Sequence, residues 1–190
     1  MPEATDATTA SAVTSTPMHL CSRCAPRLVG MIHADVSARP AVPGDEDAIA
    51  AIQLAAWRGW MGDAADALPA DQVLAQWAAA IVSPPSRDHR VFVACEGPRV
   101  VGFAAITPGE IMALEVAPEH RRAGHGSRLL SACIDTLRLQ GREDVRAWSL
   151  EGDDARRAFL ASAGLAEGGL RRTLEGPDGD LVELMYRAAL

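Results

Sequence analysis

The sequence predicts an α/β fold with a mixed β-sheet. Two pairs of strand-like segments, one in the middle of the chain and one at its C-terminal end, are each joined by a short glycine-containing turn. Such pairs are typical of antiparallel hairpins. A helix-like segment also lies between a strand-like segment over 110–116 and another over 145–150, which is the pattern of a strand–helix–strand crossover. Hairpins and a crossover together require parallel and antiparallel pairs.

One strand and two helices are expected first. The alternating segment 35–42 ends at a Pro-Gly turn and is expected to be an edge strand. The segment 44–57 begins with acidic residues, which complement the dipole of a first helical turn, and continues with apolar residues at helical spacing. We expect a loop over 58–67 and a second helix over 68–82. Pro69 is expected in the first turn of that helix.

The rest of the chain alternates between hairpins and helices. Strands are expected over 90–97, 99–108, 110–116, 145–150, 169–175 and 181–188. Helices are expected over 127–141 and 153–164, where Gly141 and Gly164 mark the ends. The expected order is therefore β-α-α-β-β-β-α-β-α-β-β.

Composition limits the classes of partner. The 190 residues are 48% hydrophobic and 23% charged, which suits one globular domain with some additional chain. The formal net charge of -7 argues against nucleic acid as the partner, because that affinity depends on Lys and Arg. An acidic protein is compatible with a cationic amine as substrate. A homodimer is compatible with the sequence, which does not decide the oligomeric state.

Residues 1–30 are rich in Ala, Thr and Ser and are expected to form a disordered tail before a domain over 31–190. His19, Cys21 and Cys24 supply three metal ligands where a structural zinc site needs four, so no metal is expected. Cys95 and Cys133 lie in apolar patterns and are expected to be buried free thiols. The sequence shows neither an apolar run of membrane-spanning length nor a secretory signal, so a cytoplasmic protein without a membrane partner is expected.

The stretch EHRRAGHGSRLL, residues 119–130, joins a predicted strand to a predicted helix. Unpaired N–H groups at a helix N-terminus attract anions, and Gly124 and Gly126 would let a phosphate approach the backbone closely. Arg121 and Arg122 would add charge-assisted contacts. A P-loop lysine motif is absent, and the third glycine of a dinucleotide fingerprint is replaced by Leu129. The junction therefore predicts a phosphate or pyrophosphate site of another kind.

Two linked motifs narrow this prediction. Arg121, Gly124 and Gly126 form R-x-x-G-x-G, and a preceding L-x-V-x-P consists of Leu114, Val116 and Pro118. With these motifs and the order of elements, the sequence over about 35–190 resembles the GNAT superfamily of N-acetyltransferases. The resemblance implies a mostly antiparallel sheet flanked by helices and splayed at its central strands to hold acetyl-CoA.

The resemblance also implies roles for individual residues. Backbone amides of the loop would hold the coenzyme A pyrophosphate; these belong to Arg122, Ala123, Gly124, His125, Gly126 and Ser127, after Arg121 at the leading position. Leu114 and Val116 would pair with the pantetheine arm, and the Val116 N–H would polarise the thioester carbonyl. Asp153 stands at the position of a family Asn. His125 is expected to be a neutral loop residue near phosphate and not a catalytic base.

Amine acylation needs a base, and two carboxylates lie on the strand over 110–116. We favour Glu110, whose position matches that of a Glu or His in related enzymes, and keep Glu115 second. Simple alternation places the two on opposite faces of the strand, unless a bulge resets it. The family Tyr that protonates the leaving thiolate is replaced by Leu160. A thiol with a pKa of about 8.5 can leave without such an acid, and Tyr186 is not assigned the role.

The expected function is transfer of an acetyl group from acetyl-CoA to a primary amine of a small molecule or peptide. The acceptor side is expected to be formed by the first helix, the segment 58–67 and the final hairpin, with Trp60 and Asp63 as candidates for substrate contact. Leu160 supports an alternative, a non-catalytic acyl-CoA-binding sensor or scaffold. An enzyme acting on a protein or on tRNA is a third reading, and the acidic balance disfavours the RNA version.

Overall fold

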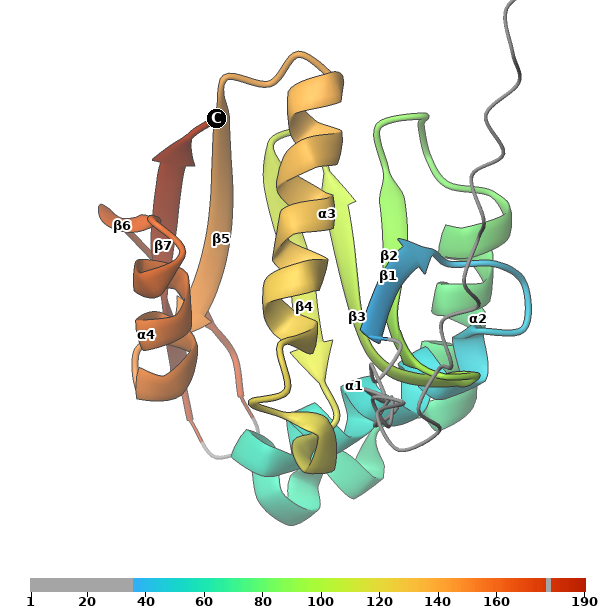
Figure 1. The fold of residues 1–190 in the computed structure, drawn as a ribbon. Coiled ribbons are helices and arrows are strands. Elements are labelled where there is room, and N and C mark those ends of the chain that lie inside the picture. Colours follow the sequence, from blue (N-terminus) through green and yellow to red (C-terminus); the bar gives the residue numbers. More distant parts are fainter. Residues whose placement is uncertain (1–35, 177–178) are drawn as a thin grey trace, which may run out of the picture. The chain divides into compact units, whose positions relative to one another are not determined.

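A mixed β-sheet forms the middle layer of the protein (Figure 1). The computed structural model describes residues 36–176 and 179–190. Within these residues the sheet has seven strands in the order β1-β2-β3-β4-β5-β7-β6. The strands are β1 (Val36–Pro40), β2 (Arg90–Glu96), β3 (Arg99–Thr107), β4 (Glu110–Val116), β5 (Asp144–Leu150), β6 (Ala166–Leu174) and β7 (Leu181–Ala189).

Neighbouring strands are antiparallel except β4 and β5, which are parallel and connected by a helix. The predicted fold class, a mostly antiparallel mixed sheet flanked by helices, is therefore confirmed. The predicted tail over 1–30, its His19, Cys21 and Cys24, and the start of the first strand lie outside the described residues. The division of the chain into 1–30 and 31–190 accordingly stays a prediction.

Helices cover both faces of the sheet (Figure 1). The helical segments are α1 (Glu46–Met61), η1 (Gly62–Ala67), α2 (Ala70–Val82), η2 (Pro118–His120), α3 (His125–Leu139) and α4 (Asp154–Ser162), where η marks a short 3-10 helix. Leu129, Cys133 and Leu137 of α3 are fully buried against one face of the sheet. Ile49 of α1 is buried against the other face, beside Phe103 of β3.

Several boundaries differ from the predictions, including the start of β6, which is Ala166 and not residue 169. The segment 58–67 is helical, because α1 continues to Met61 and η1 follows; an ion pair between Arg58 and Asp66 joins the two. Pro69 lies at the N-cap of α2, just before its first turn. The third helix, α3, begins at His125, two residues before the predicted start, because Gly124 turns the chain with a φ of 89°.

The entry into α1 is fixed by an ion pair. Arg39 of β1 donates from both terminal nitrogens to the Asp45 carboxylate, at 2.7 and 2.8 Å. That carboxylate also accepts from the Val42 N–H at 2.8 Å. The Arg39 hydrogen bonds hold the pKa of Asp45 below its usual value. This arrangement orients α1, whose C-terminal half forms one side of the cleft described below.

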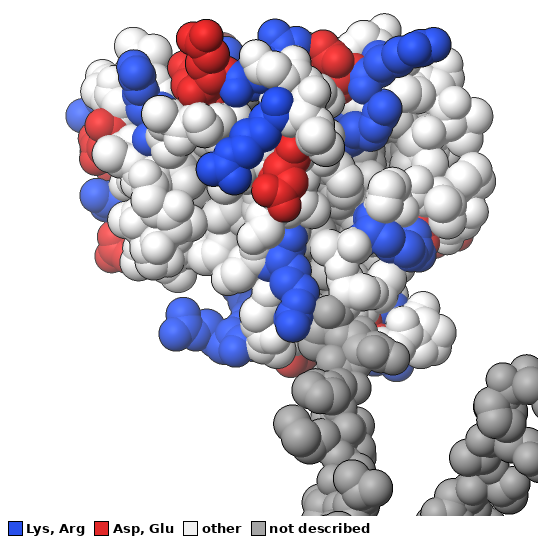
Figure 2. Space-filling view, turned by 45° about the horizontal axis from the view of Figure 1, so that its top comes forward, with Lys and Arg blue, Asp and Glu red and all other residues white. Residues whose placement is uncertain are grey.

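Surface charge is mixed on the face shown in Figure 2, where arginine side chains are separated by acidic and uncharged ones. All 18 basic residues of the sequence are arginines. Of the helices in the described ranges, none has the length and apolar character required to cross a bilayer. The two cysteines that the structure describes, Cys95 and Cys133, are buried free thiols, and burial raises the pKa of Cys133 to about 12.

Candidate active site

Strands β4 and β5 separate soon after they begin. Within the described residues their pairing is limited to Glu110 with Arg146 and Ile111 with Ala147. At the same point β4 contains a bulge against β3, because Ala105 pairs with Ala113 and the next residue, Ile106, pairs with Ile111. Met112 is the additional residue. A bulge bends and twists the strand that contains it, which moves the rest of β4 away from β5.

The bulge also changes which faces the two candidate carboxylates occupy. Ile111 and Leu114 both belong to the core beneath α3, although simple alternation would place them on opposite faces. Their neighbours Glu110 and Glu115 therefore both lie toward the α1 side of the sheet. Glu115 is also paired with Phe103, which packs on that side. The opposite placement, expected from alternation alone, is corrected by the bulge.

The separated part of β4 presents backbone groups to the space beside β5. Ala117 donates its N–H to the Val101 carbonyl of β3 at 2.9 Å. Backbone groups alternate in direction along a strand, so the N–H and C=O groups of Val116 and Leu114 point away from β3. Their carbonyls accept from side chains on the open side: Leu114 from Arg156 Nη1 at 2.9 Å, and Val116 from Arg121 Nε at 3.1 Å. The N–H groups of Leu114 and Val116 therefore lie on an open strand edge.

The junction between β4 and α3 presents a run of free backbone donors. Among the described residues, the N–H groups of residues 122–127 have no backbone or side-chain acceptor. Gly124 has a φ of 89° and Arg122 a φ of 65°, both in the left-handed region. For arginine this conformation is strained, and such strain is common at functional loops. Gly126 lies beside the Phe159 ring, where a Cβ would be 3.6 Å from its nearest atom. The geometry suits an anion at the N-terminus of α3.

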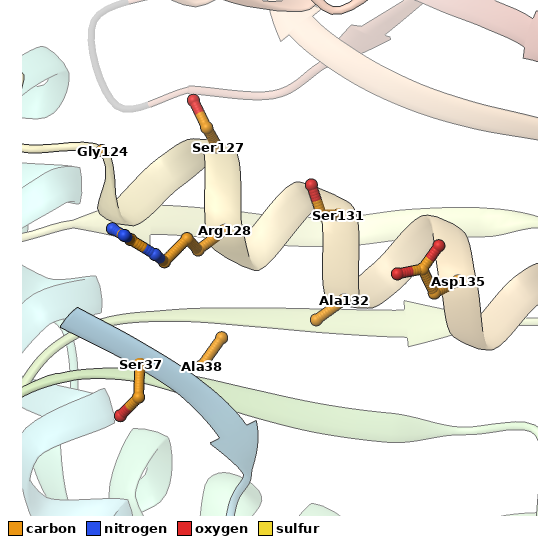
Figure 3. Close-up of a pocket in the computed structure, with 8 residues that line it drawn as sticks. All are labelled: Ser37, Ala38, Gly124, Ser127, Arg128, Ser131, Ala132 and Asp135. Atoms are coloured by element: carbon orange, nitrogen blue, oxygen red, sulfur yellow. The ribbon is translucent and has the colours of Figure 1, made fainter. Parts of the chain in front are cut away.

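A groove of about 640 Å³ runs beside α3 and begins at this junction (Figure 3). Ser37 and Ala38 of β1 line one side, and α3 lines the other. Arg128 extends back toward Gly124, and its Nη1 would be 3.4 Å from a Cβ at that position. Arg128 therefore adds positive charge next to the free amides.

On the α1 side of the sheet lies a larger cleft of about 710 Å³, between α1, the separated strands and the β6–β7 hairpin. Trp57 and Trp60 of α1 line it, together with Met112 at the bulge. Among the described residues, the charged groups that line it are Glu115, Glu151, Asp153, Asp180, Glu183, Arg121 and Arg156. Two of these acids are already paired with arginines outside the lining, Glu151 with Arg171 and Glu183 with Arg172. The remaining acidic groups give the cleft a small excess of negative charge, which is compatible with a cation.

Glu115 of β4 lines this cleft and is partly buried. Its side chain is 26% exposed, and its Oε1 accepts from Arg156 Nη1 at 3.0 Å. Burial raises the pKa of Glu115, and the charges of Arg156 and Arg121 oppose that shift. A carboxylate with a raised pKa accepts a proton more readily than an exposed one, which suits general-base chemistry.

Arg156 connects the two separated strands. In addition to its bonds to Glu115 and to the Leu114 carbonyl of β4, its Nε donates to the Trp148 carbonyl of β5 at 3.0 Å. Its position on α4 is set locally by Asp153, which caps the helix by accepting from the Arg156 N–H at 2.9 Å. Asp153 therefore orients the helix that carries Arg156.

Of the other residues predicted from the sequence, some line the cleft and others do not. Trp60 lines it and is 41% exposed, whereas Asp63 is exposed and Glu110 is half-buried, and neither is among the lining residues. Leu160 is buried in the core beneath α3, as is Tyr186, whose hydroxyl accepts from Arg157 Nε at 3.2 Å. Arg156, Glu151 and Glu183 were not predicted from the sequence, because no local motif marks them.

Comparison with known proteins assigns the family. The model of the acetyltransferase (GNAT) family matches residues 49–165, which is more than half of the chain. The chain belongs to the GNAT acetyltransferase family. The matched range contains the bulged strand β4, the free amides and the capped helix α4. The resemblance drawn from the two sequence motifs is confirmed.

Individual relatives of this GNAT protein match shorter segments. Mycothiol acetyltransferase from Corynebacterium jeikeium (strain K411) is 42% identical over 69 residues, covering 36% of this chain and 19% of that relative. Mycothiol acetyltransferase from Rhodococcus erythropolis (strain PR4 / NBRC 100887) is 35% identical over 97 residues, covering 46% of this chain and 31% of that relative. The chain thus matches less than a third of either relative's length.

A solved structure of yncA from Salmonella typhimurium, with its cofactor acetyl-CoA, superimposes with a TM-score of 0.66. It is 22% identical, and the alignment covers 82% of this chain and 94% of that one. The two proteins share the GNAT fold.

Proposed function

We propose that this GNAT protein transfers an acetyl group from acetyl-CoA to a primary amine of a small molecule or peptide. One observation carries the proposal: the free amides of residues 122–127 and the open edge of β4 lead to a cleft that contains Glu115. An anion site, a row of strand-edge donors and a partly buried carboxylate are groups that suit acyl transfer from a coenzyme thioester.

The donor half of the site would bind acetyl-CoA along the backbone. The amides of residues 122–127 would hold the pyrophosphate, with Arg122 and Arg128 adding charge, whereas the Arg121 side chain lines the cleft and donates to the Val116 carbonyl. The pantetheine arm would lie along β4 and bond to the Leu114 and Val116 backbone. The Val116 N–H would then donate to the thioester carbonyl oxygen, where negative charge develops during attack. Because Arg156 already donates to the Leu114 carbonyl, the arm must share that oxygen or displace the guanidinium.

The acceptor half is the cleft. Its acidic groups would attract an ammonium group, and Trp57 and Trp60 would pack against it. Glu115 would take the proton directly or through one water, leaving a neutral amine. The amine nitrogen would attack the acetyl carbon, so that a C–N bond forms and the C–S bond breaks. The attacking nitrogen would release its second proton to solvent as the C–S bond breaks, and the coenzyme thiolate would take up one proton from solvent. Tyr186 is not among the residues that line the cleft, and Leu160 has no proton to donate.

Of the two carboxylates, we propose Glu115 as the base and not Glu110. Glu110 pairs with Arg146 at the closed end of the two strands, before the bulge, and is outside the lining of the cleft. Glu115 lies next to Val116, whose N–H would bind the thioester. Its raised pKa also favours proton acceptance.

A sensor or scaffold that binds acyl-CoA without turnover is the second candidate. Leu160, which replaces the family Tyr and is 3% exposed, is the observation that favours it. The two candidates differ in one measurable quantity, the release of free coenzyme A thiol that depends on an added amine.

The test is therefore a panel of amines incubated with acetyl-CoA and the protein, with free thiol and acetylated product both measured. The panel should include peptides with free N-termini, polyamines and amines related to mycothiol, since two relatives are mycothiol acetyltransferases. Because the chain has no lysine, acetylation of its own side-chain amines cannot add to the background. We expect at least one amine to raise thiol release above hydrolysis. Stabilisation of the fold by acetyl-CoA without turnover on any amine would favour the sensor.

A further inference from the structure

Three potential metal ligands from separate elements meet next to the junction between β4 and α3. They are Glu96 at the end of β2, His120 in η2 and His125 at the start of α3. One ligand atom from each lies within 4.8 Å of the other two. His120 Nδ1 is 2.7 Å from Glu96 Oε2, and the two imidazole rings are 6.2 Å apart, nearly perpendicular to each other. No other cluster of this kind was found among the described residues.

The His125 ring is the feature that points to a ligand. It is 1% exposed, and neither of its ring nitrogens has a hydrogen-bond partner in the part of the chain that the structure describes. A buried polar group without a partner costs about 1–3 kcal/mol, so such a group needs an explanation. Burial lowers the pKa of His125, which keeps the ring neutral and leaves a nitrogen lone pair available.

We propose that Glu96, His120 and His125 bind a divalent transition metal of the zinc class. Two imidazoles and one carboxylate are ligands that zinc accepts in tetrahedral sites, with water in the fourth position. The Glu96 side chain is 44% exposed, so water can reach the cluster from that side. The sequence analysis did not identify this cluster: His120 and His125 are five residues apart, but Glu96 lies on strand β2 and no pattern links it to them.

Metal binding requires a modest contraction of the cluster. Zinc–ligand bonds of about 2.0–2.2 Å in a tetrahedron place ligand atoms roughly 3.3 Å apart, less than the widest separation here. Neither His120, with 18% of its side chain exposed, nor Glu96, with 44%, is fully buried, so both would have to move toward the buried His125 ring. The charge of Arg128 acts against a cation near His125, and the carboxylate of Glu96 offsets it.

Such a metal would connect the β2–β3 hairpin to the junction at which we propose coenzyme binding. Glu96 belongs to the β2–β3 hairpin, whereas the His125 N–H is one of the free donors at the junction. A metal bound to the His125 ring would restrain the residue and with it the position of its backbone N–H. Metal removal is therefore expected to weaken acetyl-CoA binding as well as lower thermal stability.

The experiment uses the full chain after chelation and titrates it with Zn²⁺ and Co²⁺. Because His19, Cys21 and Cys24 lie in the same chain, the parent protein for all titrations carries His19→Ala, Cys21→Ser and Cys24→Ser. On this parent we compare Glu96→Gln and His120→Gln with the matched control Glu119→Gln, an exposed neighbour of His120. Circular dichroism confirms that each variant is folded, and Co²⁺ absorption reports the coordination geometry.

We expect one metal per parent chain, a tetrahedral Co²⁺ spectrum without a thiolate band, and a rise in melting temperature with Zn²⁺. Glu96→Gln and His120→Gln should each weaken binding by about 100-fold or more, since outer-shell changes alone cost about 10–100-fold. Glu119→Gln should bind as the parent does. If the folded parent binds neither metal, or if His120→Gln binds as tightly as Glu119→Gln, the proposed site is wrong.

Discussion

The Arg156 guanidinium and the Glu115 carboxylate form an ion pair of 3.0 Å between two strands that have separated. The same guanidinium holds the Leu114 and Trp148 carbonyls, one on each strand. Arg156 therefore sets both the width of the opening and the electrostatic environment of the proposed base. Its charge lowers the pKa of Glu115, while burial raises it by more.

Replacing Glu115 with Gln should lower kcat by about 10²–10⁴-fold, the usual contribution of a positioned general base. The KM for acetyl-CoA should change little, because the coenzyme is held by backbone groups. Glu110→Gln is the matched control on the same strand and should retain kcat within about threefold. Steady-state thiol release on the best amine of the panel measures both. Equal losses in the two variants, or a loss only in Glu110→Gln, would contradict the assignment.

The pH profile of the wild-type enzyme should show the raised pKa of Glu115. The base acts only when deprotonated, so kcat/KM should fall as the pH drops through a value above the ordinary range of a glutamate. This acid limb should be absent from the residual activity of Glu115→Gln. An acid limb at the usual glutamate pKa would show that burial does not raise the pKa of Glu115.

Arg156→Ala should move the acid limb of the profile to higher pH. The substitution removes a positive charge that lowers the pKa of Glu115, so this pKa should rise further. Arg157→Ala is the matched control, since Arg157 is the next residue of α4 but contacts Tyr186 and Asp154 instead. An unchanged profile in Arg156→Ala would mean that the ion pair does not act on the base.

Gly124→Ala should weaken acetyl-CoA binding by about tenfold or more, equivalent to about 1.4 kcal/mol. Gly164 is a stringent control, because its φ of 89° equals that of Gly124 and nothing within 4 Å of its Cβ position would clash. Each alanine should cost about 1–2 kcal/mol of stability through left-handed strain. Calorimetric titration with acetyl-CoA separates a loss of binding from this common loss of stability. Only Gly124→Ala should weaken binding, because only Gly124 lies among the free amides. Similar affinities in both variants would argue against the proposed pyrophosphate site.

Trp60→Ala should raise the KM for the amine by about 2–30-fold, as expected if about 0.5–2 kcal/mol of cation–π contact is lost. The KM for acetyl-CoA should stay the same, since Trp60 lies on the α1 side of the cleft. Leu139→Ala removes an apolar side chain that is 89% exposed, in the last turn of α3, and serves as the control. If Trp60→Ala raised the KM for acetyl-CoA and not the KM for the amine, the cleft would be assigned to the coenzyme and not to the acceptor.

Asp45→Asn should lower the free energy of unfolding by about 1.5–3 kcal/mol at neutral pH, the usual contribution of hydrogen bonds to a charged group. The folded pKa of Asp45 is lowered, so this stabilisation is present above the unfolded pKa and is lost as the pH falls through the folded value. Denaturant unfolding at several pH values should therefore show the two proteins converging in acid. A difference independent of pH would mean that the Arg39 ion pair is not its source.

Local patterns were sufficient for much of the fold and for the position of the junction at which we propose coenzyme binding. The order of elements and the junction at Gly124 and Gly126 follow from turn residues and hydrophobic periodicity, which depend on near neighbours in the chain. The bulge at Met112 is different, because it is defined by register against β3. Without it, the relative placement of Glu110 and Glu115 cannot be deduced.

The acceptor half depends still more on tertiary structure. Arg156 reaches Glu115 from a helix 41 residues later in the chain, and this contact exists only because α4 packs beside the separated strands. Glu183 comes from β7, the last strand in the chain. No spacing in the sequence marks such residues, since each is placed by the docking of an element distant in the chain.

A crystal structure of the protein with acetyl-CoA tests most directly whether the acetyl group binds between the Val116 N–H and Glu115. We predict the pyrophosphate on the amides of residues 122–127, the acetyl oxygen within hydrogen-bond distance of the Val116 N–H, and Glu115 facing the acetyl carbon from the cleft. An acetyl group bound elsewhere, such as the groove between β1 and α3, or a Glu115 side chain turned away from it, would contradict the proposed mechanism.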